Sequence, residues 1–388
     1  MRDFAPETVD AVLDEVGSLA EEDSQMSSIA TCGLLCRQWT PCSRVHVFRR
    51  LVLNGSNIRR FFQLVESSVL PLLELAREVE LQFNDGAPFE RRYIGRLQQL
   101  VNLTALKIEV TVTGRQQDYT EDVVAFNSFL ETYLPTIGRS IKHFELCWVA
   151  HDMAVRAPWG MFPHLFECLP AIEVFKMSSS RPGTMPVYIL PDTDDNINAE
   201  MHAHPTHLHT LHLSKPISSR PFLDWLLSCR VLPVLKSLDF CTFNPNEWDR
   251  LKAYCERAGK ELRFLSLAFN SGDFGLLPGV LQHTTMLTEL LLKSCNTADY
   301  LPGILSTITS HDLRVIHVSL WTAPTGREQE EFDSSFPYGL VESVLARQQF
   351  RDLRRFRAEY DGVSVLRAAE AERLMPLAYA RGILECRS

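Results

Sequence analysis

Residues 208–240 read LHTLHLSKPISSRPFLDWLLSCRVLPVLKSLDF, and this stretch decides the fold. It begins and ends with one pattern, an apolar residue followed three and five positions later by two more: LHTLHL at 208–213 and LKSLDF at 235–240. The last four residues of each copy alternate in polarity, which is typical of a short strand with one buried face. Between the copies, residues 220–231 place apolar side chains at helical spacing. The stretch therefore predicts a strand, a returning helix and a second strand.

The six-residue pattern recurs along most of the chain. Copies begin at residues 103, 141, 172, 208, 235, 262, 287, 313 and 353, and a degenerate copy begins at 76. From 208 to 313 the steps are 27, 27, 25 and 26 residues, within the ~20–29 residues of leucine-rich repeats. A second helix is expected at 246–260. An ordinary α/β sheet would also alternate strands and helices, but it predicts no fixed step.

We therefore expect an α/β fold in which residues 51–388 form an irregular leucine-rich-repeat solenoid. One repeat cannot bury its own apolar face, so the repeats stack, with parallel strands inside and helices outside. Steps of 38, 31, 36 and 40 residues elsewhere make the array irregular. Residues 363–380 predict an amphipathic helix that caps the C-terminal end. Residues 181–205, with four prolines and no helical period, predict a long loop that is either a solvated surface excursion or functional.

Composition limits the class of protein. The chain has a net charge of -9 and a pI near 5.8, which argue against nucleic acid or an anionic membrane as the main partner. No apolar run approaches the ~18 residues of a membrane span. Its 10 cysteines are scattered rather than arranged as a dense disulfide framework. We expect a soluble protein of the cytoplasm or nucleus.

The N-terminal 50 residues have a different pattern. Residues 4–16 and 27–39 each place apolar side chains at helical spacing, and Pro6 stands where a helix start tolerates proline. Residues 34–53, LLCRQWTPCSRVHVFRRLVL, predict a helix that ends near Trp39, a turn at Pro41 and a first strand over 47–53. Two or three short helices are too few to bury a stable core alone. This module therefore needs a neighbouring domain or a partner protein.

The N-terminal module resembles the F-box in its fungal variant, and the family commonly follows its F-box with leucine-rich repeats. The motif has the form L-P-x-E-L-I-x-x-I, a spacer, A-C-S-L-V-C-R-x-W and R-x-x-L-F-R-x-L-x-L. The matching residues are Phe4, Pro6, Glu7, Val9, Val12, Leu13, Cys32, Leu34, Leu35, Cys36, Arg37, Trp39, Arg44, Phe48, Arg49, Leu51 and Leu53. Ala5 and Thr8 stand where the motif has proline and leucine.

The resemblance implies the substrate-recognition subunit of a Skp–cullin–F-box ubiquitin ligase, which itself catalyses nothing and needs no cofactor. The repeats would hold an unknown protein substrate. The residues expected to bind the Skp-type adaptor are Pro6, Val9, Val12, Leu13, Leu34, Leu35, Cys36 and Trp39. The alternative is an adaptor-independent protein-binding scaffold, in which the altered first helix no longer engages an adaptor.

Side chains that flank the inner apolar residues of each copy face outward and are candidates for substrate binding. The expected substrate-binding residues are His209, His212, Arg263, Arg314, His317, Arg354, Arg355 and Arg357. Residues 347–357, RQQFRDLRRFR, form a basic cluster that suits an acidic or phosphorylated segment, because arginine binds carboxylate and phosphate bidentately. The alternative for this cluster is a solvated last strand and cap.

One further pattern suggests chemistry. Five histidines between 202 and 212 are compatible with a transition-metal site, but LHTLHL is itself a repeat strand, so we expect no metal there. No phosphate-binding loop, nucleophile elbow or H-E-x-x-H motif is present. The second alternative for the function is an enzyme with unfamiliar residues.

Overall fold

The structure is a computed structural model. It describes residues 8–9, 11–13, 15, 39–68, 71–83, 89–112, 121–150, 162–180, 205–214, 220–242, 245–269, 277–295, 298–320, 336–360, 363–364, 366 and 368–386. The chain divides into two compact units. The first is Met1–Val155 with the short segments Cys168–Ile172 and Ser180–Pro182, and the second comprises the remaining residues.

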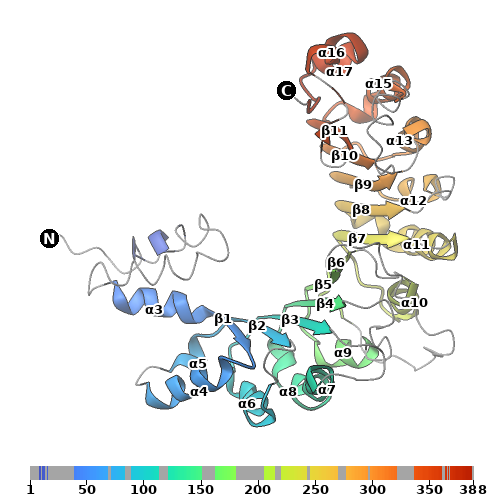
Figure 1. Cartoon of the computed structure of the whole chain (residues 1–388). Helices are drawn as coiled ribbons and strands as arrows, with labels where there is room; N and C mark the ends of the chain where they lie inside the picture. Colours follow the sequence, from blue (N-terminus) through green and yellow to red (C-terminus); the bar gives the residue numbers. More distant parts are fainter. Residues whose placement is uncertain are drawn as a thin grey trace. The chain divides into compact units, whose positions relative to one another are not determined.

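The described part of the first unit contains four strands and helices that connect them. Its elements are α3 (Thr40–Arg49), β1 (Arg50–Asn54), α4 (Ile58–Ser67), α5 (Leu72–Leu75), β2 (Glu78–Phe83), α6 (Arg91–Arg96), β3 (Ala105–Val112), α7 (Glu121–Ser128), α8 (Leu134–Ile137) and β4 (His143–Ala150). The strands pair in parallel and in chain order, β1 with β2, β2 with β3, and β3 with β4. Helices α4, α6, α7 and α8 lie on one side of this sheet (Figure 1).

The second unit repeats this plan. Its elements are α9 (Phe162–Cys168), β5 (Val174–Ser180), β6 (Thr210–Leu213), α10 (Arg220–Ser228), β7 (Ser237–Thr242), α11 (Pro245–Ala258), β8 (Phe264–Phe269), α12 (Pro278–Leu281), β9 (Glu289–Cys295), α13 (Leu301–Ser306), β10 (Val315–Leu320), α15 (Tyr338–Leu345), β11 (Arg355–Tyr360), β12 (Val363–Ser364), α16 (Ala368–Leu374) and α17 (Pro376–Ala380).

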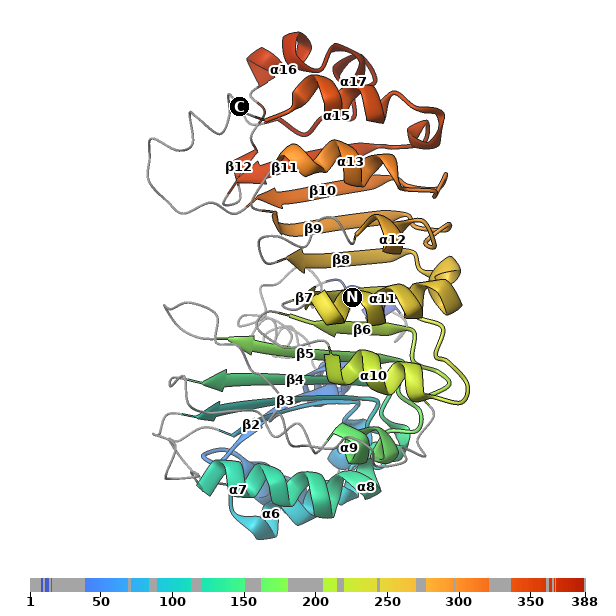
Figure 2. The same cartoon turned by 90° about the vertical axis from the view of Figure 1, so that its right-hand side faces the viewer.

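The sheet of the second unit also follows chain order. Strands β5 to β11 pair in parallel, each with the next, and β12 pairs antiparallel with β11. Helices α10, α11, α12, α13 and α15 lie together on one face of β7 to β11 (Figure 2). We call the sheet face opposite the helices the open face of each unit. The order of strands and helices and the parallel pairing confirm the expected parallel α/β architecture within each unit.

The ten apolar triplets of the sequence supply the core. In every copy the first apolar residue precedes a strand, and the second and third lie on it and point toward the helices. All 30 of these side chains are 5% exposed or less. Because alternate residues of a strand face opposite sides, positions 3, 5 and 7 of each copy lie on the open face. The helices expected at 220–231 and 246–260 are α10 and α11.

Backbone hydrogen bonds at position 2 of most copies fix the stacking of the repeats within each unit. The carbonyl of Arg263 accepts the N–H groups of Thr288 and Glu289, at 2.8 and 3.0 Å. The carbonyl of Arg314 accepts those of Arg354 and Arg355 at the same two distances. Within each unit, one carbonyl thus joins a repeat to the next before the strands begin, which sets the strand register although repeat lengths differ.

The expected start of the first strand is wrong by three residues. Residues 47–49 belong to α3, and Pro41 lies in the first turn of that helix rather than in a turn between elements. Proline is favourable there because the N–H it lacks has no intrahelical partner. The helix ends at Arg49 and β1 begins at Arg50, so no linker separates the helical module from the sheet.

The predicted C-terminal cap is two helices rather than one. Pro376 begins α17 immediately after α16, since proline cannot continue the preceding helix. The backbone of the C-terminal segment also covers the edge of β11. The N–H of Phe356 donates to the carbonyl of Ile383 at 2.7 Å, and the N–H of Glu385 donates to the carbonyl of Phe356 at 3.0 Å. The loop expected at 181–205 lies outside the described residues except for Pro205.

The six cysteines whose side chains the structure describes are free thiols. Burial raises the pKa of Cys229 to about 11 and that of Cys255 to about 12, so both thiols are protonated at neutral pH.

Among the described helices, none combines the length and the apolar character that a bilayer crossing requires.

Candidate binding surfaces

The described part of the N-terminal module has a small core of its own. Val9 and Leu13, one helical turn apart, are 3% and 0% exposed and pack against Trp39, Cys42 and Val47. This contact joins the first helix to α3. Three of the predicted adaptor-binding residues, Val9, Leu13 and Trp39, therefore hold the module together.

Val12 differs from Val9 and Leu13, because its side chain is exposed rather than buried. It is 39% exposed, and on α3 Val45 is 44% exposed. These two valines are apolar surface that a partner protein can cover. The other predicted adaptor-binding residues, Pro6, Leu34, Leu35 and Cys36, lie outside the described residues.

The predicted substrate-binding residues divide into two groups. His209, Arg263, Arg314 and Arg354 occupy position 2 of their repeats, at the edge of the sheet where the strands begin. His212, His317 and Arg357 occupy position 5 and Arg355 position 3, on the open face. Cross-strand register places His317 beside Arg357. The sequence pattern predicted one surface, whereas the structure separates an edge from a face.

The edge group is strongly basic. Lys236, which the predicted set does not include, stands at the same position as Arg263, Arg314 and Arg354, and all four side chains are exposed. None of the four forms an ion pair with another residue in the described part of the chain. Neighbouring strands are ~4.8 Å apart, so Lys236 and Arg263 are neighbours, as are Arg314 and Arg354, and Thr288 of the intervening repeat separates the two pairs. We call Lys236, Arg263, Arg314 and Arg354 the basic row.

Sequence alignment of the repeats alone could have found Lys236, because it follows the first leucine of its triplet as Arg263 does. His209 stands at the same position one repeat earlier, but its imidazole lies 3.9 Å from Glu173 and 3.0 Å from the hydroxyl of Thr210. The basic row therefore begins at Lys236.

The open face of the second unit has paired charges instead. Lys293 Nζ lies 3.1 Å from both carboxylate oxygens of Asp239, two strands away. The strand between them, β8, has Ser266 and Ala268 on this face, 0% and 2% exposed. These small side chains leave space for the Lys293–Asp239 bridge to cross β8.

His212 lies close enough to Asp239 and Lys293 to be affected by their charges. Its Nε2 is 2.8 Å from the hydroxyl oxygen of Ser237. Burial lowers the pKa of His212 below its usual 6.5; Asp239 opposes this change, whereas Lys176 and Lys293 act in the same direction as burial. His212 is therefore neutral at pH 7 and acts as a hydrogen-bonding group rather than as a cation.

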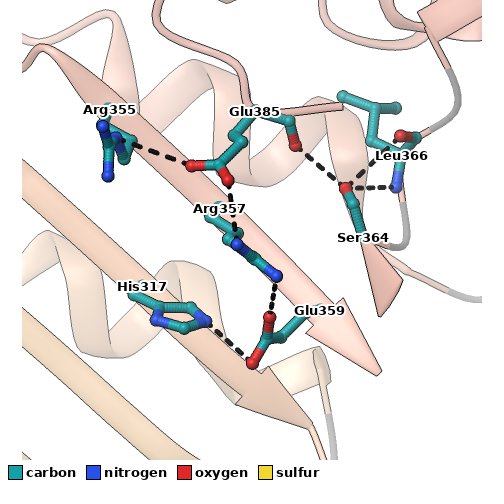
Figure 3. Close-up of polar contacts among 7 residues, drawn as sticks. All are labelled: His317, Arg355, Arg357, Glu359, Ser364, Leu366 and Glu385. Carbon is teal, nitrogen blue, oxygen red and sulfur yellow. Dashed lines mark hydrogen bonds and ion pairs between the residues drawn. The ribbon is translucent and has the colours of Figure 1, made fainter. Parts of the chain in front are cut away.

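At the C-terminal end of the sheet, two arginines, two glutamates and a histidine form a chain of ion pairs (Figure 3). Arg357 lies 2.5 Å from Glu359 and 2.8 Å from Glu385, and His317 lies 3.0 Å from Glu359. Arg355 is 3.5 Å from Glu385. An acidic ligand would have to displace these carboxylates, so Arg357 is a poorer candidate than the basic row.

Glu385 is the member of this network that sequence reasoning missed. It is 28 residues from Arg357 and outside every triplet. Its backbone carbonyl accepts the hydroxyl of Ser364 at 2.9 Å, which fixes the C-terminal segment beside β12. Only the folded cap brings Glu385 to β11.

No group of three or more His, Cys, Asp or Glu residues in the described ranges is placed to hold a metal ion. His202 and His204 lie outside those ranges, and His207 is exposed.

The sequence matches no protein-family model and no curated protein. The residues themselves therefore carry the functional argument.

Proposed function

We propose that this chain is the substrate-recognition subunit of a Skp–cullin–F-box ubiquitin ligase. The N-terminal helices bind the Skp-type adaptor, and the repeats bind a protein substrate. The observation that carries the proposal is the direct passage from α3 into β1 at Arg49 and Arg50, with Val9 and Leu13 packed on α3. A helical module without a linker is what an adaptor handle on a repeat array requires.

The proposed role is positional rather than catalytic. α3 also contacts α5 and β1, so this helix is packed against the elements that follow it in the first unit. A receptor with such a joint holds a bound substrate near the ubiquitin-charged enzyme and raises the effective concentration of its lysines. No side chain of the receptor takes part in the bond-making step.

The adaptor-facing surface would include Val12 and Val45, the exposed valines of the module. Burial of apolar side chains is the main favourable contribution to such interfaces. The substrate-facing surface would be the basic row, which suits a protein segment rich in carboxylates or phosphates. Because the chain as a whole has a negative net charge, we expect the attraction for acidic segments to be confined to the basic row.

Binding of the full chain to a purified Skp-type adaptor, measured by calorimetry, tests the proposal. We expect micromolar or tighter binding, and a loss of roughly tenfold or more in the variants Val12→Asp and Val45→Asp. Val231→Asp is the matched control, because Val231 is 61% exposed in the second unit. Absence of wild-type binding at micromolar concentration would leave the adaptor-independent scaffold.

The substrate surface has its own test. We expect the double variant Arg263→Glu/Arg314→Glu to lose the proteins that the wild-type chain captures at low salt. Arg230→Glu reverses an exposed charge of the second unit outside the basic row and serves as the control. Equal losses in both variants would mean that net charge alone, and not the basic row, holds the substrate.

A further inference from the structure

Strand β1 is the edge of the first unit's sheet, and a side chain occupies part of that edge. β1 pairs with β2 alone among the described strands. The Nδ2 of Asn57 donates to the carbonyl of Val52 at 2.9 Å, and its Oδ1 accepts the N–H of Asn54 at 2.9 Å. The carboxamide thus stands where the peptide group of a further strand would pair.

Alternation along β1 shows which backbone groups face this edge. The carbonyl of Arg49 accepts the N–H of Arg77, so Arg49 is turned toward β2. Residues two apart share a direction, so Leu51 and Leu53 follow Arg49. The backbone groups of Val52 point the opposite way, away from β2. Its N–H is therefore directed toward the free edge of the sheet.

A cavity of about 540 Å³ lies along the same strand. The end of α3, the strand itself, α4 and side chains of β2 and β3 line it. Val52 and Leu64 in its lining are 41% and 44% exposed. The cavity therefore offers apolar surface next to backbone groups of an edge strand.

The charges of the cavity are mostly positive. Arg50, Arg60 and Lys107 line it with a single carboxylate, that of Glu80. Glu80 is only 7% exposed and lies 3.7 Å from Arg50 and 3.4 Å from Lys107, and it also accepts a hydrogen bond from Gln82 at 2.9 Å. Arg60 is exposed and is recorded in no ion pair with another described residue. One buried carboxylate against three cations leaves a net attraction for anions.

We propose that this cavity binds an extended peptide segment that carries both acidic and apolar side chains and lies along the edge of β1. Carboxylates of the segment pair with Arg60 and its neighbours, and apolar side chains cover Val52 and Leu64. The N–H of Val52 donates to the peptide backbone, as in strand addition, on the part of the edge that Asn57 does not fill. The site is independent of the ligase assignment and shares no residue with the basic row.

Fluorescence anisotropy with the full chain and the labelled peptide Leu-Glu-Glu-Leu-Glu-Glu-Leu tests the proposal. We expect saturable binding that Arg60→Glu weakens by roughly tenfold or more. Arg59→Glu is the matched control, because Arg59 is exposed on the same helix but does not line the cavity. Equal losses in the two variants, or equal binding of the peptide in which lysine replaces glutamate, would overturn the proposal.

A second variant tests the backbone contact. Proline is tolerated in an edge strand only where its missing N–H faces away from the sheet. Val52→Pro should therefore keep the thermal melting transition of the wild-type protein and lose the peptide. Undiminished binding, or loss of the folded state, would show that the Val52 N–H does not serve the edge and would overturn strand addition. Arg314→Glu should leave peptide binding unchanged, which separates this site from the basic row.

Discussion

Single polar atoms in the core connect helices to the turns between repeats. Tyr254 of α11 is fully buried, and its hydroxyl donates to the carbonyl of Pro233 at 2.9 Å and accepts the N–H of Leu235 at 3.1 Å. Both backbone groups lie just before β7. The tyrosine therefore ties the helix that follows β7 to the turn that precedes it.

Replacing this hydroxyl should be costly. Tyr254→Phe leaves a buried N–H and a carbonyl without their partner, and we expect the free energy of unfolding to fall by about 1–3 kcal/mol. Urea denaturation measures it. Tyr379→Phe, at a side chain that is 47% exposed, is the control and should change stability by less than about 0.5 kcal/mol. Equal effects of the two substitutions would contradict this role of Tyr254.

Glycine 138 shows how closely backbone segments approach within the first unit. A Cβ built there would lie 2.3 Å from the carbonyl oxygen of Cys168, which is backbone and cannot rotate away. We expect Gly138→Ala to lower the melting temperature, with a loss of about 1–3 kcal/mol typical of overpacking. Gly303→Ala, where the Cβ meets nothing within 4 Å, should be neutral or stabilising. A neutral Gly138→Ala would contradict the close contact.

His212 makes the stability of the second unit depend on pH. The unfolded chain takes up a proton at this residue near pH 6.5, whereas the folded chain does so at lower pH. Protonation thus favours the unfolded state, and stability falls as pH falls below 6.5. Between about pH 7.5 and 5.5, His212→Gln should lose less stability than the wild-type protein. The exposed His311→Gln serves as the control; identical pH profiles for the wild type and His212→Gln would exclude the effect.

The apolar residues of the triplets could be assigned from the sequence, because a leucine at fixed spacing has one favourable place, the core. The hydrogen-bond and ion-pair partners of polar side chains could not be assigned in this way. Whether Arg357 meets a ligand or Glu385 depends on where the cap folds, and nothing near either residue in the sequence encodes that. The basic row was partly predictable, since Arg263, Arg314 and Arg354 share one position in their repeats.

Among the elements, strands were easier to predict than helix boundaries. Each triplet carries its own period of two, whereas residues 47–49 are compatible with both helix and strand. There the contacts of α3 with α5 and β1 decide in favour of helix. Proline had opposite consequences in two places: Pro41 begins α3, and Pro376 divides the cap into α16 and α17.

The cap depends on two side chains that bridge elements. Arg381 donates to the carbonyls of Leu345 and Phe350 at 2.8 and 2.5 Å, and Glu342 accepts the N–H of Leu377 at 2.7 Å at the start of α17. We expect Arg381→Ala to destabilise the cap by about 1–3 kcal/mol, measured as faster amide exchange in α16 and α17. Arg347→Ala, at an exposed arginine nearby, should leave exchange unchanged. Unaltered exchange in Arg381→Ala would mean that the cap holds without this bridge.

For the whole molecule, the central claim is that ten sequence triplets are ten hydrogen-bonded strands, and the proposed receptor function depends on it. The basic row exists only if consecutive repeats stack in register. Likewise, the helical module can serve as a handle only if β1 is a strand of the sheet. Repeat length varies widely, so the claim depends on the triplets and not on a uniform step.

Hydrogen–deuterium exchange of the full chain, resolved by mass spectrometry, tests this claim most directly. We predict slow exchange in all ten windows, from residues 76–81 to 353–358, because their amides open only when neighbouring repeats unfold. The exposed turns between them should exchange faster. A triplet window that exchanges as fast as an unstructured peptide would contradict the stacked array and, with it, the proposed receptor.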